Sequence, residues 1–97
     1  MRYGIDFSPQ AAQDYRDLDA DVRGRVRDAV ETHLRHQPTK ASRSRIKRLR
    51  GISRPQYRLR VGEVRVFYDV TETTVEVLAI VAKSRVDEWL ERHGEKS

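Results

Sequence analysis

The sequence predicts an α+β fold: a small antiparallel sheet with two N-terminal helices packed on one face and a short C-terminal helix. Apolar residues recur at helical spacing between residues 9 and 36, and they alternate with polar residues from residue 57 onward. A Gly-Glu pair between two alternating segments is typical of a tight hairpin turn. The 97 residues are enough for one hydrophobic core, so we expect a single domain over residues 1–97.

The first expected elements are a short strand and a capped helix. The segment YGIDFS, residues 3–8, alternates large apolar residues with small or polar ones, which predicts a strand with one buried face. Ser8 has a side-chain oxygen that can cap a helix, and Pro9 suits the first helical position because it has no N–H to leave unpaired. We therefore expect a helix over residues 9–18.

A second helix is expected to run to about residue 36. Asp19 or Asp21 can cap it, and Pro38 ends the helical pattern. One stripe of this helix is apolar and should face the sheet. Its members are Val22, Val26, Ala29, Val30, His33 and Leu34. Because a short turn joins the two helices, they should pack as an antiparallel pair.

A hairpin follows a basic segment. Residues 38–53 show no sustained period, and we expect a basic loop that leads into a strand. From Pro55 on, apolar residues alternate on both sides of a Gly62-Glu63 turn, where glycine at the first turn position favours type II′. The residues expected on one buried face are Tyr57, Leu59, Val61, Val64, Val66, Tyr68 and Val70.

The last expected elements are a buried strand and a short helix. Residues 74–82 are almost continuously apolar, which is typical of a strand covered on both faces. The helix should lie within residues 84–94 and end at Gly94. Its apolar patch, which we expect to cap the sheet, consists of Val86, Trp89 and Leu90.

Positive charge is concentrated in one part of the chain. Residues 37–65 contain ten Lys or Arg and a single acid, Glu63. This distribution is typical of a surface that faces phosphates, although a solvated loop that confers solubility is the alternative. The side chains expected on such a nucleic-acid-binding surface are Arg45, Lys47, Arg48, Arg50, Phe67 and Arg85.

The hairpin register predicts an anion site. With a two-residue loop, Arg60 faces Arg65 and Arg58 faces Phe67. Like charges opposite each other on a sheet are destabilising, so an anion held between them is an economical explanation. The alternative is that both arginines extend into solvent or pair with acids. Phe67 could stack on a base, or it could lie in the core under the C-terminal helix.

Several classes of site are not expected. The chain has no cysteine, which excludes disulfides and thiolate metal sites and fits a cytoplasmic protein. His33 and His36 are three residues apart on a predicted helix, but no third ligand accompanies them, so we expect no metal and no cofactor. No apolar run approaches the roughly 20 residues that span a bilayer, so no membrane partner is expected.

The order of elements, together with the segments YRLRVGEVRVFYDV and VEVLAIVAKSRVDEWL, resembles the RelE/ParE superfamily of bacterial toxins. The resemblance implies an antiparallel sheet with a basic site on its open face. In the RelE-like branch, such a toxin is a ribosome-dependent endoribonuclease: the 2′-hydroxyl of messenger RNA attacks the adjacent phosphate. The catalytic residues that the resemblance implies are Arg58, Arg60, Arg65 and Lys83.

Two positions depart from the RelE-like pattern. That branch commonly carries an arginine just after the last strand and a tyrosine in the tail, where this chain has Ser84 and Leu90. Arg85 could replace the arginine by a one-residue shift. A ParE-like inhibitor that binds DNA gyrase without nuclease chemistry is therefore the alternative, and a protein that keeps only antitoxin binding is a third.

The resemblance also implies partners. They are a cognate antitoxin protein, the ribosome with messenger RNA, and operator DNA bound through the antitoxin complex.

Overall fold

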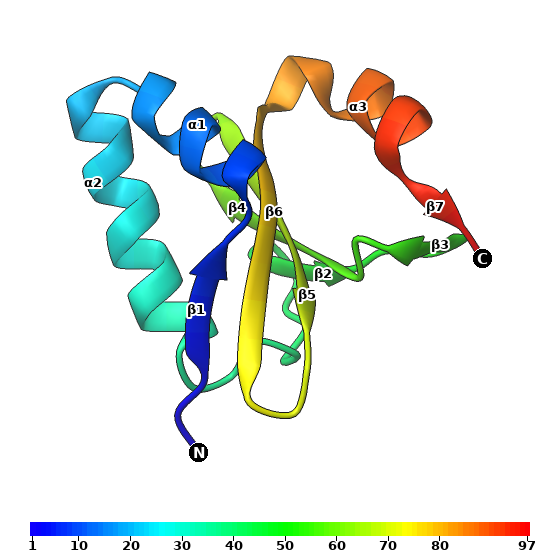
Figure 1. The fold of residues 1–97 in the computed structure, drawn as a ribbon, viewed down its shortest axis with the longest axis horizontal. Coiled ribbons are helices and arrows are strands. Elements are labelled where there is room, and N and C mark those ends of the chain that lie inside the picture. Colours follow the sequence, from blue (N-terminus) through cyan, green and yellow to red (C-terminus); the bar gives the residue numbers. More distant parts are fainter.

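The computed structural model describes residues 1–97 and has the expected α+β architecture (Figure 1). A five-stranded sheet has the order β1-β6-β5-β4-β2, and a separate two-stranded ribbon joins β3 to β7. The strands are β1 (Gly4–Phe7), β2 (Ile46–Arg48), β3 (Ile52–Arg54), β4 (Tyr57–Val61), β5 (Val64–Val70), β6 (Thr74–Ala82) and β7 (Glu95–Lys96). The helical segments are α1 (Pro9–Asp17), α2 (Ala20–Ala29), η1 (Val30–Leu34), η2 (Lys83–Arg85) and α3 (Val86–His93).

The sheet is not wholly antiparallel, because β1 runs parallel to β6. Their register pairs Gly4 with Thr74 and Phe7 with Val77. The sequence pattern did not indicate this direction, since about 70 residues separate the two strands and strand alternation is the same for either orientation. The other pairs of the five-stranded sheet, β2 with β4, β4 with β5 and β5 with β6, are antiparallel as expected.

The N-terminal helices form where the sequence predicts. The Ser8 hydroxyl accepts the Ala11 N–H at 3.0 Å, and Pro9 is the first residue of α1. Asp19 precedes α2, but its side chain makes no capping hydrogen bond; its carbonyl accepts the Arg23 N–H at 2.9 Å. The wider turns of η1 extend α2, so the helical path ends before Pro38 as expected.

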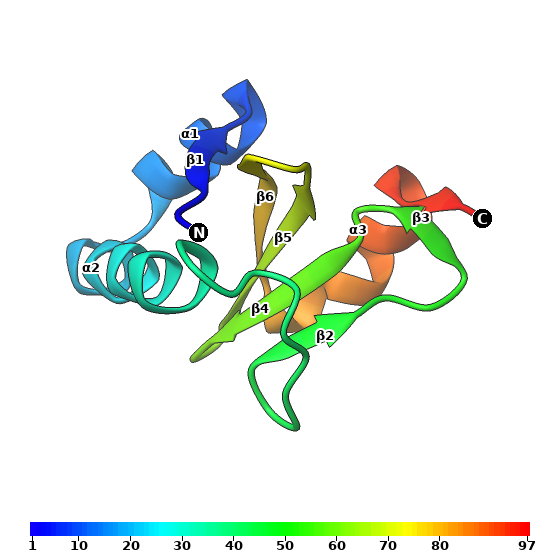
Figure 2. The same cartoon turned by 90° about the horizontal axis from the view of Figure 1, so that it is seen from below.

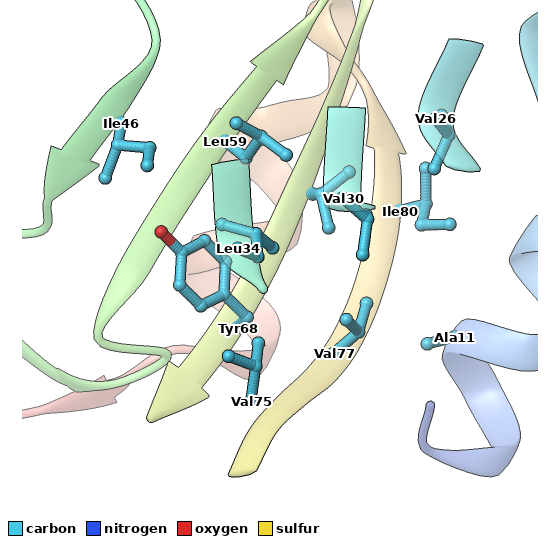
Figure 3. Close-up of a cluster of buried hydrophobic side chains, with 11 residues drawn as sticks. Ala11, Val26, Val30, Leu34, Ile46, Leu59, Tyr68, Val75, Val77 and Ile80 are labelled. Atoms are coloured by element: carbon cyan, nitrogen blue, oxygen red, sulfur yellow. The ribbon is translucent and has the colours of Figure 1, made fainter. Parts of the chain in front are cut away.

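The main core lies between these helices and one face of the sheet (Figure 3). Val26, Val30 and Leu34 of the helical stripe are buried, whereas Val22, Ala29 and His33 are half-buried. The predicted hairpin residues fill the other side, and the rings of Tyr57 and Tyr68 stack with centroids 5.5 Å apart. Burial of one such side chain contributes roughly 1.5 to 3 kcal/mol. The Tyr68 hydroxyl donates to the Pro38 carbonyl at 2.7 Å, and burial raises its pKa.

A second, smaller core lies on the opposite face of the sheet under α3. In Figure 2, α1 and α2 lie on one side of the strands and α3 lies on the other. Phe67, Ala79 and Val81 are buried there, and the partly buried residues packed against them are Leu49, Val86, Trp89 and Leu90. The predicted cap of Val86, Trp89 and Leu90 is confirmed.

The basic segment is more ordered than expected. Residues 38–53 contain β2, which pairs Ile46 with Leu59 of β4, and most of β3. The tail after Gly94 then pairs with β3 as β7. The sequence shows no period there because these strands have only two or three residues each, too few to establish an alternation. None of the helices has the length and apolar character needed to cross a membrane.

A candidate nucleic-acid interface on the β4–β5 hairpin

The hairpin has the predicted register. Arg60 pairs with Arg65, Val61 with Val64, and Arg58 with Phe67. Gly62 has a φ of 55°, a left-handed conformation that glycine adopts without the steric cost that a side chain would add. Glu63 has no positive φ, so the two turn residues match the expected type II′ geometry. Alternation places the apolar partners in the main core and the arginines on the opposite face.

Arg60 and Arg65 differ in their surroundings. Arg60 is exposed, whereas only 7% of Arg65 is exposed. Nη1 of Arg65 donates to the carbonyl oxygens of Gly62 at 2.8 Å and Val64 at 3.0 Å, so the guanidinium folds back onto the turn. Neither arginine forms an ion pair with a carboxylate. The repulsion between the two charges is therefore relieved by backbone carbonyls and solvent, without an acidic partner.

Arg58 has an unsatisfied donor. Its side chain is half-buried, and its Nε has no hydrogen-bond partner and no contact with solvent. Burial lowers the pKa of Arg58, and the charges of Arg65 and Arg60 lower it further. An unpaired buried donor costs about 1 to 3 kcal/mol. Lys47 on β2 lies opposite Arg58 and is exposed, so this end of the sheet presents several cations to any anion that approaches.

Lys83 lies beside the same hairpin. Its backbone N–H donates to the Glu63 carbonyl at 2.8 Å, which places the first residue of η2 next to the turn. The residue itself is exposed. Arg58, Arg60 and Arg65 thus lie near one another on the hairpin, and the backbone of Lys83 lies beside its turn.

The residues expected to bind RNA do not form one surface. Arg48 lies over the Tyr57 ring at 5.2 Å, on the helix-covered face of the sheet, and donates to the Gln56 carbonyl. Arg85 lines a groove of about 660 Å³ between α1 and α3 and pairs with Glu88 at 3.9 Å. Arg45 lies close enough to His33 to lower its pKa, in addition to the larger effect of burial. Arg50 is exposed in the turn after β2. Lys47 lies opposite Arg58, and the Arg45 carbonyl accepts the Arg60 N–H at 2.8 Å, so these two members of the set border the hairpin arginines.

Phe67 cannot stack on a base in this arrangement. It is fully buried, and the Trp89 ring stacks on it with centroids 4.8 Å apart and an angle of 11° between the planes. The prediction that Phe67 contacts RNA is therefore wrong. Phe67 instead lies in the core under the C-terminal helix, which was the alternative that the sequence allowed. The strand pattern showed which face carries the ring but not that α3 covers it.

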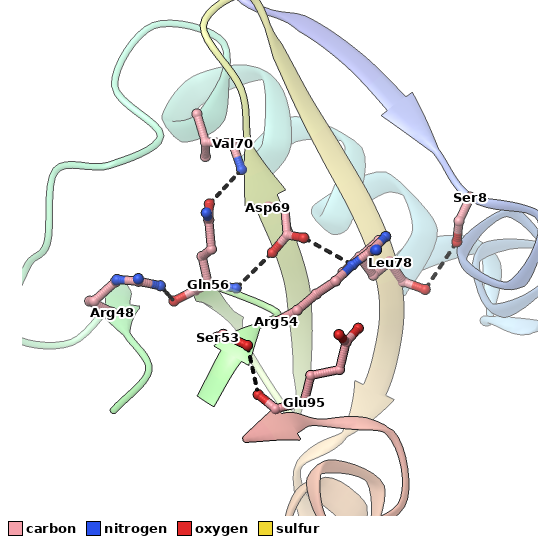
Figure 4. A network of polar contacts seen from close by, with 9 residues as sticks. All are labelled: Ser8, Arg48, Ser53, Arg54, Gln56, Asp69, Val70, Leu78 and Glu95. Carbon is pink, nitrogen blue, oxygen red and sulfur yellow. Dashed lines mark hydrogen bonds and ion pairs between the residues drawn. The ribbon is translucent and has the colours of Figure 1, made fainter. Parts of the chain in front are cut away.

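A polar network at the other end of the hairpin was not predicted (Figure 4). Asp69 accepts the Gln56 N–H at 2.8 Å and pairs with Nε of Arg54 at 3.1 Å, while the Gln56 amide oxygen accepts the Val70 N–H at 2.8 Å. Burial raises the pKa of Asp69. The network joins the segment after β3 to β5, and it neutralises Arg54, which therefore adds no free charge to the hairpin. The sequence signal that could have indicated this network is Asp69, an acidic residue within the alternating strand β5.

No three metal-ligating side chains gather in the structure. The candidate interface carries the guanidinium groups of Arg58, Arg60 and Arg65 and the ammonium group of Lys83. Such a set can bind anions and stabilise negative charge.

Comparison with known proteins identifies the family. The family model described as the ParE toxin of the type II toxin–antitoxin system, parDE, matches residues 5–87. The chain belongs to this family. It is a type II toxin of the RelE/ParE superfamily, as the resemblance indicated. A search of curated proteins found no match.

Solved structures support the fold of this toxin. A chain of the archaeal RelE–RelB complex from Pyrococcus horikoshii OT3 superposes with a TM-score of 0.71 at 22% sequence identity, over 88% of this chain and 99% of that one. A chain of the toxin–antitoxin complex RelBE2 from Mycobacterium tuberculosis has a TM-score of 0.65 at 23% sequence identity, and the match covers 84% of this chain and 99% of that one. A chain of the YoeB dimer from Staphylococcus aureus has a TM-score of 0.64 at 22% sequence identity, and the match covers 84% of this chain and 97% of that one. At these identities the similarity establishes the shared fold.

Proposed function

We propose that this toxin is a ribosome-dependent endoribonuclease that cleaves messenger RNA through attack of a 2′-hydroxyl on the adjacent phosphate. One observation carries the proposal: Arg58, Arg60, Arg65 and Lys83 meet at the hairpin without an acidic partner, and the buried Nε of Arg58 has no hydrogen bond. A phosphodiester can supply negative oxygens to the exposed Arg60 and Lys83, while the charges of Arg58 and Arg65 behind them add to the positive potential.

The residues have distinct roles in this proposal. Arg60 is exposed and can contact the scissile phosphate directly. Arg65 is held by the Gly62 and Val64 carbonyls, so its charge is oriented before substrate arrives, which is the condition for effective electrostatic stabilisation. Arg58 and Lys83 contact flanking phosphates. A guanidinium stays protonated, so the arginines stabilise charge and do not act as general bases.

The test is 5′-end mapping of cellular RNA minutes after the toxin is induced without antitoxin. We expect new ends at in-frame codon positions, and their loss in Arg60→Ala and in Arg60→Ala/Arg65→Ala, since one charge-stabilising donor contributes about 100-fold or more to rate. Arg27→Ala is the control because Arg27 is an exposed arginine on α2 that lines a groove with no hairpin residue in it. Normal cutting by the double variant would show that the hairpin is not the active site.

Folding must be checked separately in this test. Arg65 bonds the turn, so its removal can loosen the hairpin, whereas exposed Arg60 makes no side-chain contact of this kind. Arg60→Ala should unfold at the wild-type temperature, measured by circular dichroism. Loss of cutting in this single variant then reports on chemistry alone.

A second function, inhibition of DNA gyrase by protein binding, has its own support. The matching family model is described as the ParE toxin of parDE, and Leu90 stands where the RNA-cleaving branch commonly has a tyrosine. Purified toxin should then reduce supercoiling by gyrase at saturating concentration, and growth should arrest without new RNA ends. Absence of growth arrest would point to a protein that keeps only antitoxin binding and operator regulation.

The proposed partner is an antitoxin protein. The solved complexes of similar fold pair RelE with RelB in Pyrococcus horikoshii OT3 and in Methanococcus jannaschii. We expect an antitoxin segment with acidic side chains to cover the basic hairpin of this toxin, because it would satisfy the same donors as a phosphate. Ribosome and operator DNA remain proposals of the same kind, and the cytoplasm is the location that follows from them.

A further inference from the structure

The hairpin turn is surrounded by cations from three elements. Nη1 of Arg65 on β5 bonds the Gly62 carbonyl, and Lys83 of η2 bonds the Glu63 carbonyl through its N–H. The third cation comes from the helical layer: a Cβ placed on Gly62 would lie 3.5 Å from Nη1 of Arg25. Arg25 belongs to α2, on the other side of the sheet from α3. Its guanidinium therefore lies next to the glycine whose carbonyl binds Arg65.

Few negative charges offset this group. Asp21 lies 3.8 Å from Nη2 of Arg25, but both side chains are mostly exposed, at 63% and 78%. An exposed pair at that distance contributes little and is screened by salt. Glu63 is the acid of the turn itself, and it forms no ion pair. The tip of the hairpin therefore has cationic side chains on its helix side and on its strand side, and Glu63 is the one acid within the turn.

We propose that Arg25 is a further phosphate contact, so that the RNA backbone passes from the Arg60 and Arg65 face around the hairpin tip onto α2. This inference rests on the proposed function and adds a residue that lies outside the basic segment. Gly62 favours it, because a side chain at this position would start 3.5 Å from Nη1 of Arg25 and lie between Arg25 and the turn. The nucleic-acid surface then spans two layers of the fold.

Arg27 provides a matched control on the same helix. Its side chain is 67% exposed, against 63% for Arg25, and it pairs weakly with Asp28 at 3.7 Å as Arg25 does with Asp21. Arg27 lines a different groove, between β1 and the helices, together with Ile5 and Tyr15. Removal of either charge changes the net charge equally, so a difference between the two variants reports position alone.

The experiment measures binding of a labelled 12-nucleotide single-stranded RNA by the full chain between 50 and 200 mM KCl. Each phosphate contact on a single strand contributes about 0.7 to the slope of log affinity against log salt. Arg25→Gln should lower the slope by about 0.7 and weaken binding about fivefold at 0.1 M salt. Arg27→Gln should match the wild type, and Arg25→Lys, which keeps the charge, should restore the slope.

The outcomes separate the inference from the function on which it rests. Equal slopes for Arg25→Gln and Arg27→Gln, with binding lost in Arg60→Ala, would overturn the role of Arg25 and leave the hairpin site intact. Wild-type binding by Arg60→Ala/Arg65→Ala would overturn the role of Arg25 and also the hairpin as an RNA-binding site. An absence of RNA binding by the wild type at 50 mM salt would also overturn the inference, while RNA end mapping would still decide the nuclease function independently.

Discussion

The two faces of the sheet have the same alternating strands but different coverage. The face under α1 and α2 is apolar along the whole β4–β5 hairpin, and one continuous core covers it. On the other face, α3 covers Phe67, while the hairpin end carries Arg60 and Arg65 with no helix over them. The proposed catalytic arginines thus lie on the part of the second face that the short C-terminal helix does not cover.

The largest difference between the faces should appear in stability. Leu59→Ala, on the helix-covered face, should lower the free energy of unfolding by about 2 to 5 kcal/mol because it leaves a cavity in a fully buried site. Arg60→Ala, next in sequence but on the other face, should change it by less than about 0.5 kcal/mol. Urea unfolding followed by circular dichroism measures both. Equal losses of unfolding free energy in the two variants would contradict the assignment of Leu59 to the core and of Arg60 to the solvent-exposed face.

Trp89→Ala tests the small core under α3. It should cost about 2 kcal/mol, since Trp89 is half-buried and stacks on Phe67. The chain has one tryptophan, so fluorescence of the wild type reports this contact directly. Fluorescence and circular dichroism should give coincident unfolding curves if α3 and the sheet unfold together. An earlier fluorescence transition would show that the α3 face opens first.

Gly62→Ala probes the turn that joins β4 to β5. The left-handed φ of 55° should make alanine destabilising by about 1 to 2 kcal/mol. Gly62→Asn should cost less, because asparagine tolerates this conformation better. Thermal unfolding compares the two variants, and equal stability of both with the wild type would show that the turn relaxes.

The smallest effect concerns Asp69 and pH. Burial raises its pKa above the unfolded value, so the folded state favours the protonated carboxyl. That contribution is fully present below the unfolded pKa and is lost as pH rises through the folded value. The stability of the wild type relative to Asp69→Asn should therefore fall as pH rises across the acidic range. If the wild type instead gained stability relative to Asp69→Asn as pH rises, the hydrogen bond from Gln56 and the charge of Arg54 would lower the pKa of Asp69 more than burial raises it.

The sequence by itself determined the local structure of this toxin. The alternation on both sides of Gly62 and Glu63 was enough to pair Arg60 with Arg65, because a two-residue loop leaves only one register. Ser8 and Pro9 were enough to start α1, since capping depends on neighbours within one turn. These features depend on contacts between residues close in sequence, and the strand pattern sufficed for them.

Only the tertiary structure decided which charges meet and which rings are covered. The parallel pairing of β1 with β6, the packing of Trp89 on Phe67 and the approach of Arg25 to Gly62 each join segments that are far apart in the chain. Local periodicity contains no information on such pairs, because the same alternation is compatible with several arrangements of layers. The packing of the helices therefore set the limits of the exposed basic surface.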